Sequence, residues 1–135
     1  MRREEWIARL GQLQSLKKEV DELSQRIAKL ELAAQGRISC RQGTRKLEGR
    51  IAELSERLDA RRLACMEELG RLYAFIDEIP DSITRRVFTA RYIDGLTWQA
   101  TAFRIDEHDE QYPRRLHNQY LEKLKDDEND EKSDL

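Results

Sequence analysis

Four polar side chains with hydrogen-bonding chemistry recur at helical spacing near the C-terminus. Arg114, Arg115, Asn118 and Gln119 fall on one side of a helical wheel, together with Glu122. The opposite side holds mainly apolar residues, namely Pro113, Leu116, His117, Tyr120, Leu121 and Leu124. This pattern predicts a helix that buries one face and offers guanidinium and amide groups on the other.

Two shorter helices are expected before this one. Asp81 or Ser82 can cap a helix that ends at Gly95, where a left-handed residue is needed. Thr97 can cap a second helix over residues 98 to about 104, and a polar turn at 106–111 follows it. Three short helices with a capped second helix and a polar third helix fit a helix-turn-helix.

The residues of this segment resemble the C-terminal, region-four helix-turn-helix of sigma factors. The resemblance covers the segment 80–124 and is carried by RYIDGLTWQATAFRI, followed by RRLHNQYLEKL. It is closest to the phage-encoded, ArpU-like and sigma-like regulators of late transcription, which combine an N-terminal helical region with an Arg-Tyr-Ile-x-Gly-x-Ser/Thr-Trp turn. The matching positions are Arg91, Tyr92, Ile93, Gly95, Thr97, Trp98, Ala102, Ile105, Leu116, His117, Leu121 and Leu124.

The resemblance implies that the last helix enters the major groove of double-stranded DNA. The two arginines of that helix would contact guanine edges or phosphates, and its Asn and Gln would read adenine edges. A Gln and an Arg of the preceding helix would contact the DNA backbone. The site residues implied in this way are Arg114, Arg115, Asn118, Gln119, Gln99 and Arg104.

An acidic turn directly before the last helix supports a different interpretation. Its carboxylates suit the N-terminal end of a helix, but they repel phosphates. The helix-turn-helix could therefore be a scaffold for a protein-binding module of a phage, such as an inhibitor of a host nuclease or polymerase. In that case the binding residues are Asp106, Glu107, Asp109 and Glu110. A small terminase subunit, which also couples a helix-turn-helix with a coiled coil, is a further alternative.

The sequence pattern of the N-terminal half predicts two long amphipathic helices. The first runs from about Glu4 to Ala34, with an apolar heptad seam from Leu13 onward. A loop is expected at 35–43, Thr44 is a plausible N-cap of the second helix, and Pro80 ends that helix. An antiparallel helical hairpin is the simplest way to bury both seams, although pairing between two copies into a homodimer is an open alternative.

Together these patterns predict an all-α chain made of a long antiparallel coiled-coil hairpin followed by a trihelical helix-turn-helix. The expected divisions are a hairpin arm at 1–79, the helix-turn-helix at 80–124 and an acidic, disordered tail at 125–135. The arm would serve dimerisation or docking to RNA polymerase or another host protein. The net charges of 1–76, 77–124 and 125–135 are +4, −2 and −4, so nucleic acid is not bound through bulk charge.

The sequence lacks the motifs that are typical of enzymes, metal sites and membrane proteins. No Gly-rich phosphate loop and no common catalytic motif occurs, so no enzyme, catalytic residue or cofactor is expected. His117 is expected to be a packed, hydrogen-bonded side chain, and His108 an exposed one. Cys40 and Cys65 have no partners at metal-ligand spacing, so no metal site is expected. No apolar run reaches the length of a membrane span and no leader is evident, which favours a cytoplasmic protein without a membrane partner.

Overall fold

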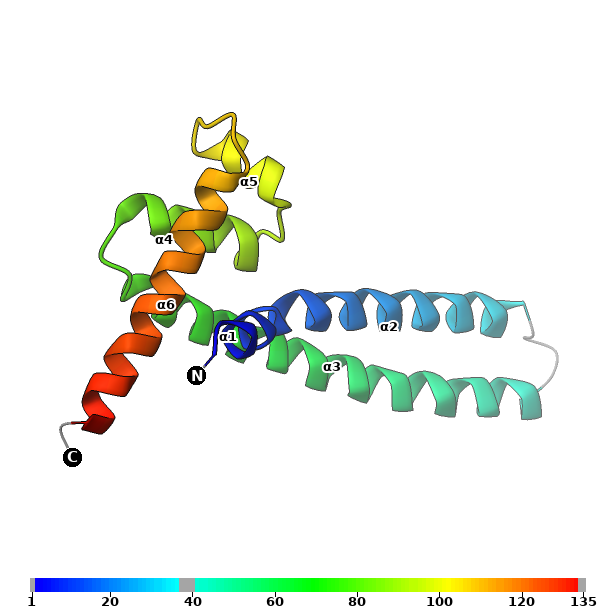
Figure 1. Ribbon diagram of the computed structural model, residues 1–135. Helices are drawn as coiled ribbons and strands as arrows, with labels where there is room; N and C mark the ends of the chain where they lie inside the picture. The colour runs from blue at the N-terminus through cyan, green and yellow to red at the C-terminus, as the bar shows by residue number, and fades with distance from the viewer. Residues whose placement is uncertain (1, 37–40, 134–135) are drawn as a thin grey trace. The chain divides into compact units, whose positions relative to one another are not determined.

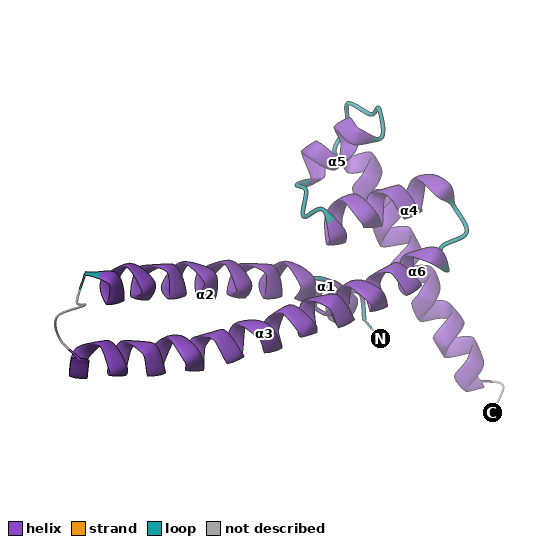
Figure 2. Cartoon of the chain, turned by 180° about the vertical axis from the view of Figure 1, so that it is seen from behind, coloured by secondary structure: helices purple, strands orange, loops and turns teal. Residues whose placement is uncertain are grey.

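A computed structural model describes residues 2–36 and 41–133, with only the backbone described for 41–42 and 126–133. Over these residues the chain forms helices and no strand, which confirms the all-α class (Figures 1 and 2). The elements are α1 (Arg3–Leu10), α2 (Gln12–Gln35), α3 (Arg41–Asp77), α4 (Ser82–Phe88), the π-helical turn η1 (Thr89–Ile93), α5 (Trp98–Arg104) and α6 (Gln111–Ser133).

The first predicted helix is in fact two helices, because the helix is interrupted at Gly11. Glycine is a poor helix former, and here it lies between α1 and α2 as a turn. Leu10 and Leu13, on either side of the break, are 4% and 1% exposed. The expectation of one unbroken helix from Glu4 to Ala34 is therefore wrong.

The loop expected at 35–43 is shorter than the sequence suggested. Gln35 still belongs to α2, and α3 already begins at Arg41, so Thr44 lies inside α3 and is not its N-cap. Arg and Gln are good helix formers, and a long helix tolerates the low helix propensity of Gly43. Residues 37–40, which include Cys40, lie outside the described residues.

Residues 15–67 form one of two compact units. Within it, α2 and α3 run side by side in opposite directions (Figures 1 and 2). The core of this unit contains Ile27, Leu54 and Leu58, against which Val20, Leu23, Leu30 and Ile51 pack. At the surface, Arg61 Nε donates to Glu19 Oε2 across 2.6 Å. The apolar seam of α2 is thus covered by α3 of the same chain.

The other compact unit combines residues 1–14 with residues 68–135. Its core is aromatic, because the Phe75 ring lies 5.2 Å from the Trp6 ring, 5.8 Å from Phe88 and 6.0 Å from Tyr120, measured between centroids. Phe88 itself is completely buried. These units differ from the division expected at 1–79 and 80–124, since α1 and the end of α3 contribute to the core of the C-terminal unit.

The segment between Pro80 and Gly95 begins as expected. The carboxylate of Asp81 accepts a hydrogen bond of 3.0 Å from the backbone N–H of Thr84, which confirms the N-cap of α4. The helix then widens into η1, where the N–H of Asp94 donates to the carbonyl of Thr89. The wider turn buries both Tyr92 and Ile93, which are 5% and 7% exposed.

The last helix is longer than predicted. α6 continues to Ser133, whereas the sequence suggested a disordered tail over 125–135. No glycine or proline follows Pro113 to end the helix. Extending an existing helix avoids the costly nucleation step, so polar residues of moderate helix propensity can prolong it.

Candidate nucleic-acid interface

The start of α5 is set by residues that the sequence identified. Gly95 has a φ of +69°, a conformation that glycine adopts without a side-chain penalty, and it reverses the chain after η1. The Thr97 hydroxyl then accepts a hydrogen bond of 3.1 Å from the N–H of Ala100, which confirms the predicted cap. Ala102, on the inner face of α5, is 2% exposed, and its small side chain allows α6 to pack closely against this helix.

A tight turn connects α5 to α6. Asp106 has a φ of +62°, which is uncommon for a residue with a side chain and reverses the chain direction. The N–H of Glu107 donates to the carbonyl of Ala102 across 2.9 Å. The Asp109 carboxylate accepts from the N–H of Gln111, also at 2.9 Å, where α6 begins. These bonds determine the direction in which the first turn of α6 leaves α5.

The inner face of α6 is held by a buried histidine. His117 is 1% exposed, its Nε2 lies 2.6 Å from the Tyr92 hydroxyl and its Nδ1 lies 2.9 Å from Asn118 Oδ1. Burial lowers the pKa of His117 to about 4 and raises the pKa of Tyr92 to about 12. Both groups are therefore neutral near pH 7, and His117 is the packed, hydrogen-bonded residue that the sequence predicted.

The six predicted DNA contacts fall into two groups. Arg115, Gln119, Gln99 and Arg104 are exposed, whereas Arg114 and Asn118 are half-buried and contact other side chains of the fold. Gln111, which the sequence analysis did not select, is exposed as well. The spacing of four places Gln111, Arg115 and Gln119 in one row along α6, which we call the outer stripe. That spacing is visible in the sequence and could have identified Gln111.

Arg114 and a second arginine both lie over the Trp98 ring. The central guanidinium carbon lies 5.6 Å from the Trp98 ring centroid for Arg114 and 4.3 Å for Arg91. Arg91 also donates to the carbonyl of Leu96 across 2.7 Å, and burial lowers its pKa. No carboxylate among the described residues forms an ion pair with either arginine. The Arg91–Trp98–Arg114 cluster therefore carries positive charge that the described part of the chain does not neutralise.

The two predicted contacts on α5 lie along a surface hollow. Gln99 and Arg104 line this hollow together with Phe103, whose side chain is 82% exposed. The guanidinium group of Arg104 forms an ion pair with Asp94, which compensates part of its charge. The sequence analysis did not identify Phe103 as an exposed residue.

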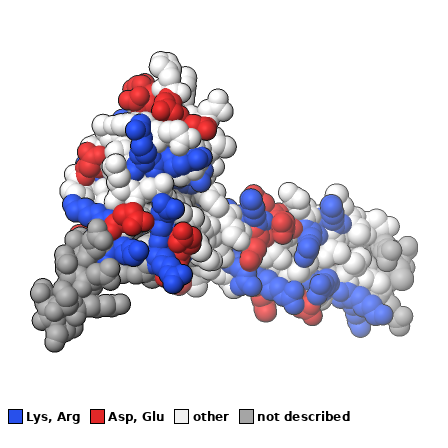
Figure 3. Space-filling model, viewed as in Figure 1, with Lys and Arg blue, Asp and Glu red and all other residues white. Residues whose placement is uncertain are grey.

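The predicted acidic residues surround the start of the outer stripe. Four carboxylates are exposed in this turn, those of Asp106, Glu107, Asp109 and Glu110. One oxygen of the Asp109 carboxylate accepts the hydrogen bond from Gln111 at the start of α6. Figure 3 shows acidic side chains over the α5–α6 turn and basic side chains close by on the same face. The candidate interface therefore has both signs of charge.

No family model, curated protein or solved structure matches this chain. Within the described residues, no helix is long and apolar enough to cross a membrane. The same residues include no group of three or more His, Cys, Asp or Glu side chains arranged as metal ligands, and Cys65 is a free thiol.

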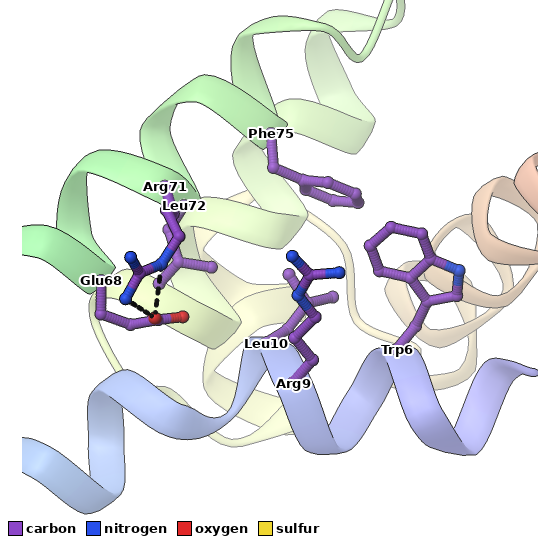
Figure 4. Close-up of a pocket in the computed structure, with 7 residues that line it drawn as sticks. All are labelled: Trp6, Arg9, Leu10, Glu68, Arg71, Leu72 and Phe75. Carbon is purple, nitrogen blue, oxygen red and sulfur yellow. Dashed lines mark hydrogen bonds and ion pairs between the residues drawn. The ribbon is translucent and has the colours of Figure 1, made fainter. Parts of the chain in front are cut away.

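A separate cavity of about 140 Å³ lies between α1 and the end of α3 (Figure 4). Its lining is mostly apolar, and Arg71 holds Glu68 Oε2 through two hydrogen bonds at 3.0 and 2.8 Å. The lining residues are Trp6, Arg9, Leu10, Glu68, Arg71, Leu72 and Phe75. None of the residues predicted to bind DNA or protein lines this cavity.

Proposed function

We propose that the chain is a DNA-binding transcriptional regulator of the phage or prophage type, in which α5 and α6 act as a sigma-like helix-turn-helix. The observation that carries this proposal is the outer stripe of Gln111, Arg115 and Gln119 on a helix whose opposite face is buried. These side chains project from the first turns of α6, the part of a recognition helix that enters the major groove. Arginine can bind guanine with two hydrogen bonds, and glutamine can do the same with adenine.

The Arg91–Trp98–Arg114 cluster supports the same proposal in a different way. Stacking on an indole ring holds a guanidinium group in place, and an unneutralised pair of cations favours an anionic ligand such as a phosphate group. We therefore assign Arg114 to the DNA backbone and Arg115 and Gln119 to base edges. Phosphate contacts orient the protein on DNA, whereas contacts with base edges select the sequence.

In this proposal, the paired helices α2 and α3 have a role other than DNA binding. Residues 15–67 form a compact unit without any of the residues assigned to DNA. We assign this arm to dimerisation or to docking on RNA polymerase, in a cytoplasmic protein.

Selection from a pool of random DNA duplexes tests the proposal. The protein is incubated with the pool at low and at moderate salt, and the retained duplexes are sequenced. We expect an enriched motif that is lost in Arg115→Ala/Gln119→Ala and kept in Gln25→Ala/Arg26→Ala, a matched exposed pair on α2. Failure to enrich any duplex, with the protein folded by circular dichroism, would contradict the proposal.

The same experiment separates the two kinds of contact. Arg114→Ala is expected to weaken binding to all duplexes and to reduce the slope of log K against log salt by about one, without changing the motif. A changed motif in Arg114→Ala would instead assign this residue to a base edge.

A protein-binding module is the second candidate, favoured by the four exposed carboxylates of the α5–α6 turn and by the 82% exposure of Phe103. Its partner would be a basic host protein, such as a nuclease or polymerase. Neutralising Asp106, Glu107, Asp109 and Glu110 to the amides should abolish such a complex. If DNA binding becomes stronger in this variant and no protein partner is captured by the wild type, this second candidate is wrong.

A further inference from the structure

The cavity between α1 and the end of α3 has the size of a site for a small ring. Its volume is about 140 Å³, and an apolar protein cavity of about 150 Å³ can hold a benzene molecule. Two of its lining residues, Leu10 and Leu72, are 4% and 2% exposed, and the rings of Trp6 and Phe75 form the rest of its apolar wall. All four residues belong to the same compact unit, so the cavity is part of one folded core.

A buried carboxylate gives this cavity an unpartnered polar atom. Glu68 is 8% exposed, and Arg71 donates two hydrogen bonds to the same oxygen, Oε2. No described residue donates to the other oxygen, Oε1, which Figure 4 shows on the side toward Leu10 and Arg9. A buried acceptor that lacks a donor costs free energy, so Oε1 favours a ligand with an N–H or O–H group.

The charges around the cavity favour a neutral ligand. Arg9 and Arg71 line it together with Glu68, so its wall has two guanidinium groups and one carboxylate. The two arginines would repel a ligand ammonium group, and a ligand carboxylate would repel Glu68 and offer its free oxygen no donor. The guanidinium carbon of Arg9 lies 5.9 Å from the centroid of the Trp6 ring, and a cation placed there can also interact with the face of an aromatic ligand.

We propose that this cavity binds a small neutral aromatic compound with one hydrogen-bond donor, the chemistry of a phenol. The ring lies against Leu10, Leu72 and Phe75, and its hydroxyl donates to Oε1 of Glu68. Arg71 already holds the carboxylate through Oε2, so Glu68 does not have to reorient when the ligand binds. None of these residues is assigned to DNA, so the inference goes beyond the proposed function and does not depend on it.

NMR titrations of the full chain with phenol and with toluene test the need for a donor. The two ligands have nearly the same shape, but toluene has a methyl group in place of the hydroxyl. Phenol is expected to bind with a dissociation constant on the order of 1 mM or below, since so small a ligand makes few contacts. Toluene should bind about tenfold more weakly, because it leaves Oε1 without a donor.

Three results of these titrations would overturn the proposal. The first is that phenol does not bind, and the second is that toluene binds as tightly as phenol or more tightly. The third is that benzoate or benzylamine binds more tightly than phenol, which would assign the cavity to a charged ligand.

Two glutamate variants test whether Glu68 is the acceptor. Glu68→Leu removes the carboxylate, so toluene should bind to this variant at least as tightly as phenol. Glu67→Leu, at the exposed neighbouring residue, is the matched control and should keep the tenfold preference for phenol. Circular dichroism shows whether both variants are folded. An unchanged preference for phenol in folded Glu68→Leu contradicts the proposed contact.

The wild type also reports the site directly, even if Glu68→Leu does not fold. Nuclear Overhauser effects are expected between the ring protons of bound phenol and the methyl groups of Leu10 and Leu72, because both side chains line the cavity. Phenol that binds without these effects lies elsewhere on the protein, and the assignment of this cavity is then wrong.

Discussion

A single buried imidazole should make the stability of the C-terminal unit depend on pH. His117 has a pKa of about 4 in the folded chain, against an ordinary value of 6.5. Above pH 6.5 the imidazole is neutral in both states and has no effect. As the pH falls from 6.5 to 4, only the unfolded chain takes up the proton, so stability decreases and then levels off. A shift of this size corresponds to up to about 3 kcal/mol in the free energy of unfolding.

Urea unfolding between pH 7.5 and 4.5 measures this effect. His117→Phe keeps a ring next to Phe88 and removes the titrating group, so the pH dependence in this window should largely disappear even though the variant loses the bond to Tyr92. His108→Asn, at an exposed residue, is the control and should follow the wild type. The explanation fails if His117→Phe and wild type lose stability in parallel.

At the level of elements, the turn after η1 depends on a close approach between distant segments. The side-chain amide of Gln14 donates to the carbonyls of Tyr92 and Ile93, each at 3.1 Å. A Cβ atom added to Gly95 would lie 2.6 Å from the Gln14 side-chain oxygen. Gly95 is therefore required both for its positive φ and for the space that Gln14 occupies.

Gly95→Ala should reduce the free energy of unfolding by about 1–2 kcal/mol through the left-handed conformation alone, with a further loss from displacing Gln14. In a double-mutant cycle, Gln14→Ala removes the steric conflict, so the double variant should lose less than the sum of the two single variants. Gly70→Ala is the control, because nothing lies within 4 Å of its added Cβ, and it should be neutral or stabilising. Additive losses at Gly95 and Gln14 would show that the two residues do not conflict.

The elements that the sequence predicted well are those with local causes. Asp81 and Thr97 cap helices because a hydroxyl or carboxylate can reach a free N–H three residues ahead, and both hydrogen bonds are present. The errors at Gly11 and at Thr44 concern where a helix ends or begins, which depends on weak propensities. The half-burial of Arg114 was also not predictable, because it depends on Trp98 from another helix.

At the scale of the whole molecule, the division into units could not be derived from the order of helices along the chain. The C-terminal unit includes residues 1–14, because Trp6 packs on Phe75 and Leu10 is buried within that unit. A heptad seam shows that a helix needs a partner, but it does not show which end of the seam belongs to which core. Aromatic residues offer a better guide, since every one of them lies outside residues 15–67.

This distribution allows the two units to be monitored separately in one protein. Near-ultraviolet circular dichroism arises from aromatic side chains and therefore reports on the C-terminal unit, whereas the far-ultraviolet signal reports on all helices. Deletion of residues 2–10 removes Trp6 and Leu10, and burial of one large apolar side chain contributes about 1.5–3 kcal/mol. The free energy of unfolding obtained from the near-ultraviolet signal in urea should therefore decrease by about 3 kcal/mol or more.

A shortened arm is the matched control for this deletion. Removing residues 24–30 together with 51–57 takes seven residues from each helix and leaves residues 1–14 and 68–135 intact. This variant should lose far-ultraviolet helical signal, while its near-ultraviolet transition stays close to that of the wild type. An unchanged near-ultraviolet transition after deletion of residues 2–10 would contradict the role of α1 in the aromatic core. The C-terminal helices would then be stable without α1, and the division expected from the sequence would hold for stability.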